Sequence, residues 1–427
     1  MLFRSFPSLL HSIQSKICIL WLLIHIYISF LKQNFVTFLK AFMMNPLSKL
    51  KKVKKRKVLV ISGGGVQSGI QCLYLKFNGN WDLLASSFSP YPQKVSDFIE
   101  LCAKQDESFR LCDLSWLDYK ISTLLTESAK TVLMGLPTAL RSPHYIVLNK
   151  PVIWRGAIGE NQQQSHWDFS LGDAQYVASM FNVPVLTDFV RHNILAGGIG
   201  VLPTNPGNQI IASRSSGIAV FLNIGAISRM SIIDVATSTV LIDSDCGPGS
   251  CLQNKFIKEN LNIKDGFDRD GCFAAEGKVE GDCLNKLAST EWFLKPAPKD
   301  ALFNQFDDLL LFPTLKSLPA ADQVATITAL SARSAYDFFR REYKLKIAPN
   351  AVYVSGGAVN NLTLMEYLKT YFSPIPVHSI ETLGIPADMR IPLALGITSD
   401  AYVSGVSIPW ESGNSPRIDP LARWVLP

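Results

Sequence analysis

Six residues near the middle of the chain combine a carboxylate with a glycine-rich turn. The sequence Asp245-Cys246-Gly247-Pro248-Gly249-Ser250 follows an apolar, β-branched run at 237–242, which predicts a buried strand that ends at the turn. Backbone NH groups in such a turn can face an anion, and the carboxylate can anchor a metal ion beside it. This pattern indicates phosphoryl transfer. The alternative is a plain tight turn, because Gly and Pro supply the φ angles that turns require.

Two further glycine-rich turns follow strand-like runs. Ser62-Gly63-Gly64-Gly65 comes after residues 57–61, and residues 71–77 predict a second strand antiparallel to that run. Late in the chain, residues 351–354 lead into Ser355-Gly356-Gly357-Ala358 and then Asn360. Glycines allow a backbone to approach a ligand closely. The recurrence predicts two related halves that both contribute to a phosphate site.

An acid stands at the end of another strand. Residues 183–186 predict a strand that leads into Thr187 and Asp188. Ligands of open α/β sheets lie at the carboxyl ends of strands, so Asp188 is a candidate site residue. Its alternative role is that of a helix cap or turn residue.

Helical patterns alternate with these strands, which is typical of an α/β fold. Asp173 opens one of them. In the second half, an apolar run at 217–227 precedes a predicted strand pair at 231–243 that ends at the Asp245 turn. The predicted helices cover residues 96–103, 119–134, 172–181, 251–260, 274–287, 320–343 and 361–372.

Length and charge narrow the class of protein. At 427 residues, 48% hydrophobic and 18% charged, the chain is long enough for two ordinary cores. Residues 1–57 hold 11 of the 41 basic side chains and none of the 35 acidic ones, so the remaining 370 residues carry a net charge of −5. Because the positive charge is confined to one tail, nucleic-acid binding is not predicted.

Residues 1–56 form a basic, apolar N-terminal extension. Residues 17–31 are mostly apolar but shorter than the ~20 residues of an untilted span. They fit a signal-peptide core, a short signal anchor that gives membrane contact, or an upstream extension bypassed by starts at Met43 or Met44. The basic run 51–57 fits a localisation signal, a phospholipid-attracting segment or a solvated linker. The eight cysteines lack CxxC spacing and an accompanying His cluster, so no zinc site is predicted. Their even number allows disulfides, but a chain with this much apolar sequence does not need them, which favours reduced thiols and a cytoplasmic location.

In order and spacing, these motifs resemble the anhydro-N-acetylmuramic acid kinases, a family of the sugar kinase, heat-shock cognate and actin ATPase superfamily. The resemblance covers residues 57 to about 405. It implies an α/β fold of two actin-like, ribonuclease H-like domains, 57–218 and 219–427, with a nucleotide and sugar cleft between them. It is most specific at Gly172-Asp173, Val185-Leu186-Thr187-Asp188-Phe189, Ala196-Gly197-Gly198, Leu222-Asn223-Ile224-Gly225 and Asp245-Cys246-Gly247-Pro248-Gly249.

The resemblance also implies a reaction, its cofactors and a homodimer. Family members use ATP and Mg²⁺ to convert a 1,6-anhydro amino sugar into its 6-phosphate, adding water at C1. Asp188 matches the catalytic base, which takes a proton from that water. Asp245 would hold Mg²⁺ through water. The other implied contacts are Gly63, Gly64, Gly65, Gly247 and Gly249 with the phosphates, Gly356, Gly357 and Asn360 with the nucleoside, and Arg155, Asp173, Gly197 and Gly198 with the sugar.

The first loop departs from the family pattern Ser-Gly-Thr-Ser-x-Asp-Gly-x-Asp. Residues 63–71 contain neither aspartate, which favours an alternative: a catalytically weakened member that binds nucleotide or sugar for regulation. Activity is favoured because Asp188, Asp245 and the paired glycines persist together. Arg155 stands where the family has Ser-His-Gly-Gln-Thr; its guanidinium would pair with phosphate or an acidic sugar, or lie on the surface at a strand edge. The acceptor sugar is left open.

Overall fold

The computed structural model describes residues 46–64, 69–104, 109–158, 165–198, 200–261, 263, 266–301, 304–406, 408 and 421–427, without the side chains of 46–47, 103–104, 155–158 and 165–166. The chain separates into a segment up to Val53 and a compact unit from Lys54 to Pro427. The first contains α2 (Pro46–Leu50). In the described ranges, no helix has the length and apolarity needed to cross a bilayer. The predicted membrane-contact segment 17–31 lies outside the described residues.

The first sheet begins as an antiparallel meander. β1 (Arg56–Gly63), β2 (Gly69–Phe77) and β3 (Trp81–Pro90) pair in sequence. Two later strands, β4 (Tyr145–Asn149) and β7 (Val185–Thr187), run parallel to β1, giving the order β3-β2-β1-β4-β7. Because both faces of the sheet are covered, β1 is a nearly unbroken apolar run.

The second sheet repeats this pattern. β8 (Ile218–Ile224), β9 (Ile227–Asp234) and β10 (Thr239–Pro248) form the meander, and β11 (Ala351–Ser355) and β12 (Val377–Ser379) run parallel to β8. The order β10-β9-β8-β11-β12 therefore matches the order β3-β2-β1-β4-β7 strand for strand, and the first sheet has one further edge strand. This duplicated order is that of the ribonuclease H-like halves of actin-type ATPases, and it confirms the predicted fold class.

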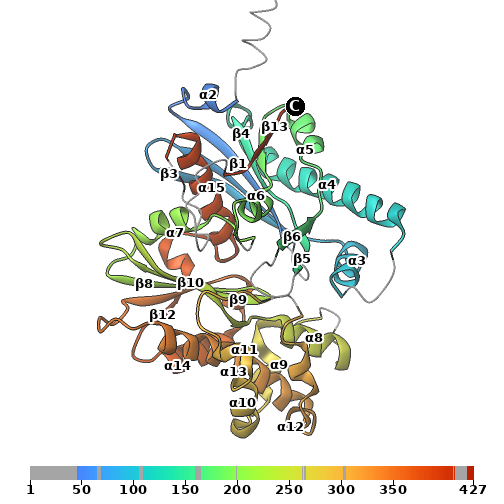
Figure 1. Ribbon diagram of the computed structural model, residues 1–427, viewed down its shortest axis with the longest axis vertical. Helices are drawn as coiled ribbons and strands as arrows, with labels where there is room; N and C mark the ends of the chain where they lie inside the picture. The colour runs from blue at the N-terminus through green and yellow to red at the C-terminus, as the bar shows by residue number, and fades with distance from the viewer. Residues whose placement is uncertain are drawn as a thin grey trace, which may run out of the picture. The chain divides into compact units, whose positions relative to one another are not determined.

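Helices cover the faces of both sheets (Figure 1). On the first sheet, α4 (Leu111–Met134) packs on β1, β2 and β3, while α15 (Arg390–Val403) packs on β1, β2 and β4. On the second, α13 (Ala320–Glu342) packs on β9 and β10, beside α14 (Leu362–Phe372). A small two-stranded sheet pairs β5 (Val152–Ile158) with β6 (Ser165–Ser170). The other α-helices of the described ranges are α3 (Gln93–Lys104), α5 (Ala174–Phe181), α6 (Phe189–Leu195), α7 (Asn205–Ala212), α8 (Cys251–Asn260), α9 (Cys272–Glu276), α10 (Gly281–Ala288), α11 (Glu291–Leu294) and α12 (Pro313–Lys316).

The chain returns to the first sheet at its far end. α15 lies against β1, where a Cβ on Gly396 would come within 2.7 Å of Val60 Cγ2. Arg56 of β1 forms a buried ion pair with Asp400 of α15. β13 (Arg423–Val425) adds an antiparallel edge strand beside β7. Both α15 and β13 lie within the predicted second domain, 219–427, although they pack on the first sheet. The domain boundary at residue 218 stays a prediction.

Two predicted elements differ from the structure. Residues 274–287 form not one helix but α9 and α10, because the chain crosses the start of α13 at Gly277, where a Cβ would lie 2.1 Å from Ala321 O. The strand before Asp245 does not end there: β10 continues to Pro248 with an irregular register between Asp245 and Gly247. Asp245 is therefore held by a strand backbone rather than by a free turn.

Candidate active site

A cavity of about 630 Å³ is lined by residues of both sheets. Ser62, Gly63 and Gly64 reach it from the end of β1, and Asn149 and Lys150 from the end of β4. The second sheet contributes the ends of its equivalent strands β8 and β11. The cavity thus lies at the carboxyl ends of parallel strands, where ligands of α/β folds bind. The lining residues of the second half include Asn223, Gly225, Arg229, Asp245, Asp300, Gly356 and Gly357.

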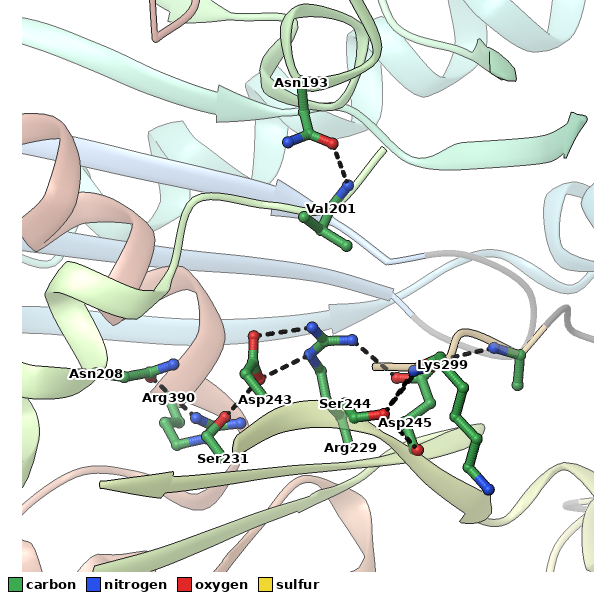
Figure 2. Close-up of polar contacts among 11 residues, drawn as sticks. Asn193, Val201, Asn208, Arg229, Ser231, Asp243, Ser244, Asp245, Lys299 and Arg390 are labelled. Atoms are coloured by element: carbon green, nitrogen blue, oxygen red, sulfur yellow. Dashed lines mark hydrogen bonds and ion pairs between the residues drawn. The ribbon is translucent and has the colours of Figure 1, made fainter. Parts of the chain in front are cut away.

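A buried charged network lies on the second-half wall (Figure 2). Arg229 Nη2 lies 2.8 Å from Asp243 Oδ2, and Arg229 Nη1 lies 3.1 Å from Asp245 Oδ1. Ser231 Oγ donates to Asp243 Oδ1 at 2.8 Å. Burial opposes ionisation of Asp243, but the charge and hydrogen bonds of Arg229 outweigh it, so the pKa of Asp243 lies below its usual value. Arg229 and Asp243 therefore form a fixed ion pair beneath the cavity.

Asp245 differs from Asp243 in its protonation. Its Oδ2 accepts from Ala301 N at 2.9 Å, and Asp300 lines the cavity beside it. Burial and the negative charge of Asp300 raise the pKa of Asp245 to about 6, despite the attraction of Arg229. Two neighbouring carboxyl groups therefore face the cavity, and one of them holds a proton more strongly than a solvated acid does.

This protonation predicts a pH-dependent difference between the protein and its Asp245→Asn variant. The folded state holds the Asp245 proton up to about pH 6, whereas the unfolded chain releases it near pH ~3.9. The stability contributed by that proton is thus present at low pH and lost as pH rises through about 6. We expect the variant to gain stability relative to the parent, on the order of 1–3 kcal/mol, between pH 4 and pH 7.

Urea denaturation of both proteins at several pH values measures this difference. Asp82→Asn, at an exposed carboxylate paired with Lys76 at 3.7 Å, is the matched control and should follow the parent. If the free energies of unfolding of the parent and Asp245→Asn changed with pH in parallel, the raised pKa of Asp245 would be contradicted.

The predicted base, Asp188, lies at the junction of β7 and α6 in a left-handed conformation, with φ 65°. Its side chain is 6% exposed and each oxygen has a cationic partner: Lys150 Nζ lies 2.7 Å from Oδ1 and Arg423 Nε 2.9 Å from Oδ2. Burial raises the pKa of Asp188. The positive charges of Lys150, Arg423 and Arg191 lower that pKa by more, so it lies below its usual value. Asp188 is thus an ionised carboxylate that is not among the described lining residues, whereas its partner Lys150 is.

Only some of the predicted phosphate and nucleoside residues line the cavity; the others pack against neighbouring backbone and side chains or are exposed. Gly63, Gly64, Gly356 and Gly357 line the cavity with Asp245, while Gly65 lies outside the described residues. Gly247 and Gly249 serve close packing: a Cβ on Gly247 would lie 2.1 Å from Ser334 Oγ, and one on Gly249 would lie 2.0 Å from Gly225 O. Asn360, in the short turn after β11, is exposed. Their ligand contacts stay predictions.

Of the predicted sugar residues, Asp173, Gly197 and Gly198 are not among the described residues that line the cavity. Asp173 caps α5 by accepting from Gln175 N at 2.8 Å. Gly198 fits against Asn193, whose side chain a Cβ would overlap at 2.3 Å; Gly197 has φ 90° at the end of α6. Asn193 Oδ1 also accepts from Val201 N at 3.0 Å (Figure 2), and so shapes a loop that does line the cavity. The Arg155 side chain lies outside the described residues.

Three cationic residues at the site were not among the predicted site residues. Lys150, Arg229 and Arg423 have no motif of their own, although Lys150 directly follows the apolar run of β4. The reasoning that selected Asp188, an ionisable residue at a strand end, would have found Lys150 had that strand been recognised. No sequence signal links Arg423 to a residue more than 200 positions earlier.

Two sheets of one strand order, with glycine turns from both at a shared cavity, define an actin-type ATPase fold. The family model for anhydro-N-acetylmuramic acid kinase matches residues 50–413, so the chain belongs to that family. The anhydro-N-acetylmuramic acid kinase of Pseudomonas paraeruginosa is 28% identical over 342 residues, 77% of this chain and 87% of that protein. Its namesake from Synechococcus is 25% identical and covers 86% of this chain and 97% of its own.

Among solved structures, the activator of 2-hydroxyisocaproyl-CoA dehydratase from Clostridium difficile, with bound ADPNP, is 10% identical with a TM-score of 0.42. It covers 81% of this chain and 96% of its own. Because this similarity is low, the fold assignment rests on the repeated strand order of the two sheets.

Proposed function

We propose that the protein is an ATP-dependent kinase that opens a 1,6-anhydro amino sugar of the anhydro-N-acetylmuramic acid type and phosphorylates its O6. Family membership supports this proposal. The observation that carries it is the cavity shared by both halves, with the turns of β1 and β11 at its wall and the ionised Asp188 paired with Lys150. Charge-stabilising groups and a carboxylate base are what phosphoryl transfer coupled to hydration requires.

In the proposed reaction, a water oxygen forms a bond to C1 while the C1–O6 bond breaks, and the Asp188 carboxylate takes the water proton. O6 then forms a bond to the γ-phosphorus of ATP as the bridging P–O bond to ADP breaks. The proton on Asp188 passes to solvent after product release. Gly63 and Gly64 line the cavity, and the Gly64 N–H donates to Gly69 O at 2.8 Å, so the support for the proposed phosphate contact of this turn is the close approach that glycines allow, not a hydrogen bond from Gly64.

The donor set fits Mg²⁺. Asp245 and Asp300 present carboxylate oxygens at the cavity, and Mg²⁺ is usually held by one or two carboxylates together with substrate phosphates. Within the described ranges, no group of three or more His, Cys, Asp or Glu side chains gathers as a metal cage, which agrees with that mode of binding. When bound, the ion would neutralise phosphate charge, and the proton that Asp245 holds would be displaced.

The direct test is an assay of the purified chain with ATP, Mg²⁺ and 1,6-anhydro-N-acetylmuramic acid. We expect ADP release that depends on the sugar, a sugar 6-phosphate detected by mass spectrometry, and ¹⁸O from labelled water at C1. Nucleotide binding without product would favour the catalytically weakened alternative. Turnover with an anhydro-hexose and not with the amino sugar would revise the acceptor. The homodimer and a cytosolic location stay predictions that accompany this function.

A further inference from the structure

Lys150 is positioned by strand pairing rather than by a motif. It is the first residue after β4, which runs parallel to β1 with Asn149 opposite Ser62. Asn149 Nδ2 donates to Ser62 Oγ at 3.0 Å, which fixes the two strand ends together. Lys150 therefore lies beside the turn at Gly63 and Gly64, the first of the predicted phosphate turns, and its side chain lines the cavity with 14% exposure.

The other neighbour of Lys150 is Asp188. Their ion pair, at 2.7 Å, occupies one of the three N–H donors of the ammonium group. Asp188 does not depend on Lys150 alone, because Arg423 of β13 pairs with its second oxygen. The carboxylate thus has a cationic partner besides Lys150, and the remaining N–H groups of Lys150 can serve a ligand in the cavity.

Charge balance at the cavity gives Lys150 a second role. Among the described lining residues, the cationic side chains are Lys150 and Arg229, and Arg229 is already paired with Asp243 and Asp245. Residues 63–71 carry no aspartate, so the first loop supplies no carboxylate for a phosphate-bound metal ion. Of these two cations, Lys150 is therefore the one with donors left for a bound triphosphate, because Arg229 is held by two buried acids.

We propose that Lys150 is a catalytic residue that bridges the two halves of the reaction, with one N–H on Asp188 and another on the transferred γ-phosphoryl group. This inference rests on the proposed function. Lys150 stays protonated throughout: it orients the carboxylate that accepts the water proton and neutralises charge on the phosphoryl oxygens. Arg423 acts through Asp188 as a positioning residue. In this chain a lysine at the end of β4 thereby takes on charge compensation that the first loop lacks.

The test compares Lys150→Met and Lys150→Arg with the parent, using Lys76→Met, a half-exposed lysine on β2, as the matched control. By calorimetry with Mg²⁺, we expect Lys150→Met to weaken ATP binding by about 10-fold and ADP binding by less than about 2-fold, because the lost contact is to the γ-phosphate. Its kcat is expected to fall by about 10²–10³-fold. Lys150→Arg should restore most of the ATP affinity.

The pH profile adds a readout that a purely structural role would not change. Lys150, Arg423 and Arg191 face Asp188, with His192 of α6 against its backbone oxygen at 3.0 Å. Removing one cation raises the pKa of the carboxylate, so the acid limb of kcat/KM should move to higher pH in Lys150→Met and not in the control. Equal loss of ATP and ADP affinity, or an unmoved acid limb, would overturn the proposal.

The two proposals fail in different ways. If the parent chain shows no sugar-dependent turnover, the proposed function fails while the selective loss of ATP affinity still measures the phosphate contact of Lys150. If the parent turns over and Lys150→Met binds ATP and titrates as the parent does, the role of Lys150 fails alone.

Discussion

The Asp188→Asn variant is expected to retain ATP binding and to lose about 10²–10⁴-fold in kcat, the range that a general base contributes. The amide is isosteric with the carboxylate but cannot take a proton from the attacking water. Asn also suits the backbone here, since Asp188 has φ 65° and Asn is one of the few residues that tolerate that region. The exchange therefore tests the chemistry of the carboxylate, with turnover assays and calorimetry as the measurements.

Asp270→Asn is the matched control, because Asp270 is also a left-handed aspartate, with φ 57°, but is exposed and absent from the cavity lining. It should turn over like the parent. If Asp188→Asn also retained full turnover, Asp188 would not be the base. If it lost ATP binding together with turnover, the ion pairs with Lys150 and Arg423 would be the more important property of Asp188.

Replacing Arg229 by Met is expected to lower the free energy of unfolding by about 3–5 kcal/mol. Met fills much of the same volume but leaves Asp243 and Asp245 in the interior without their shared cation. Asp243 loses its ion pair and keeps the hydrogen bond from Ser231, which does not neutralise its charge. The midpoint of urea denaturation near neutral pH measures the effect.

Arg333→Met provides the comparison, because Arg333 pairs with Asp337 one helical turn away on a partly exposed face of α13. Surface pairs of this kind contribute about 0–1 kcal/mol. A cost below about 1 kcal/mol for Arg229→Met would show that the network is solvated, and it would remove burial as the main physical reason for the raised pKa of Asp245.

Periodicity sufficed for the elements whose pattern is local. The strand at 57–61 and the helix at 320–343 correspond closely to β1 and α13, because each is apolar at its own repeat. β3 was missed since its partly exposed side chains do not form an apolar run. β13 was missed since three residues become a strand only through pairing with β7, more than 200 positions away.

The candidate site likewise contains residues with a local sequence signal and residues whose position depends on contacts distant in sequence. Glycines and Asp188 are visible in a sequence because turns and strand ends have local signals. The raised pKa of Asp245 has no such signal, because it comes from burial and from the charge of Asp300, against the attraction of Arg229. These groups meet only when β9, β10 and the loop before residue 301 are assembled. Lys150 and Arg423 acquire their roles only when four separate strands of the first sheet are assembled.

The return of α15 to the first sheet has a consequence for how the protein is made. The second sheet is built from one continuous stretch, β8 to β12, whereas the first needs strands near residue 60 and a helix that ends at Val403. A nascent chain usually completes its N-terminal part first. Here the apolar face of β1 and β2 that receives Gly396 emerges from the ribosome several hundred residues before its cover. All strands of the second sheet have therefore been synthesised by β12, before α15 and β13 complete the first half.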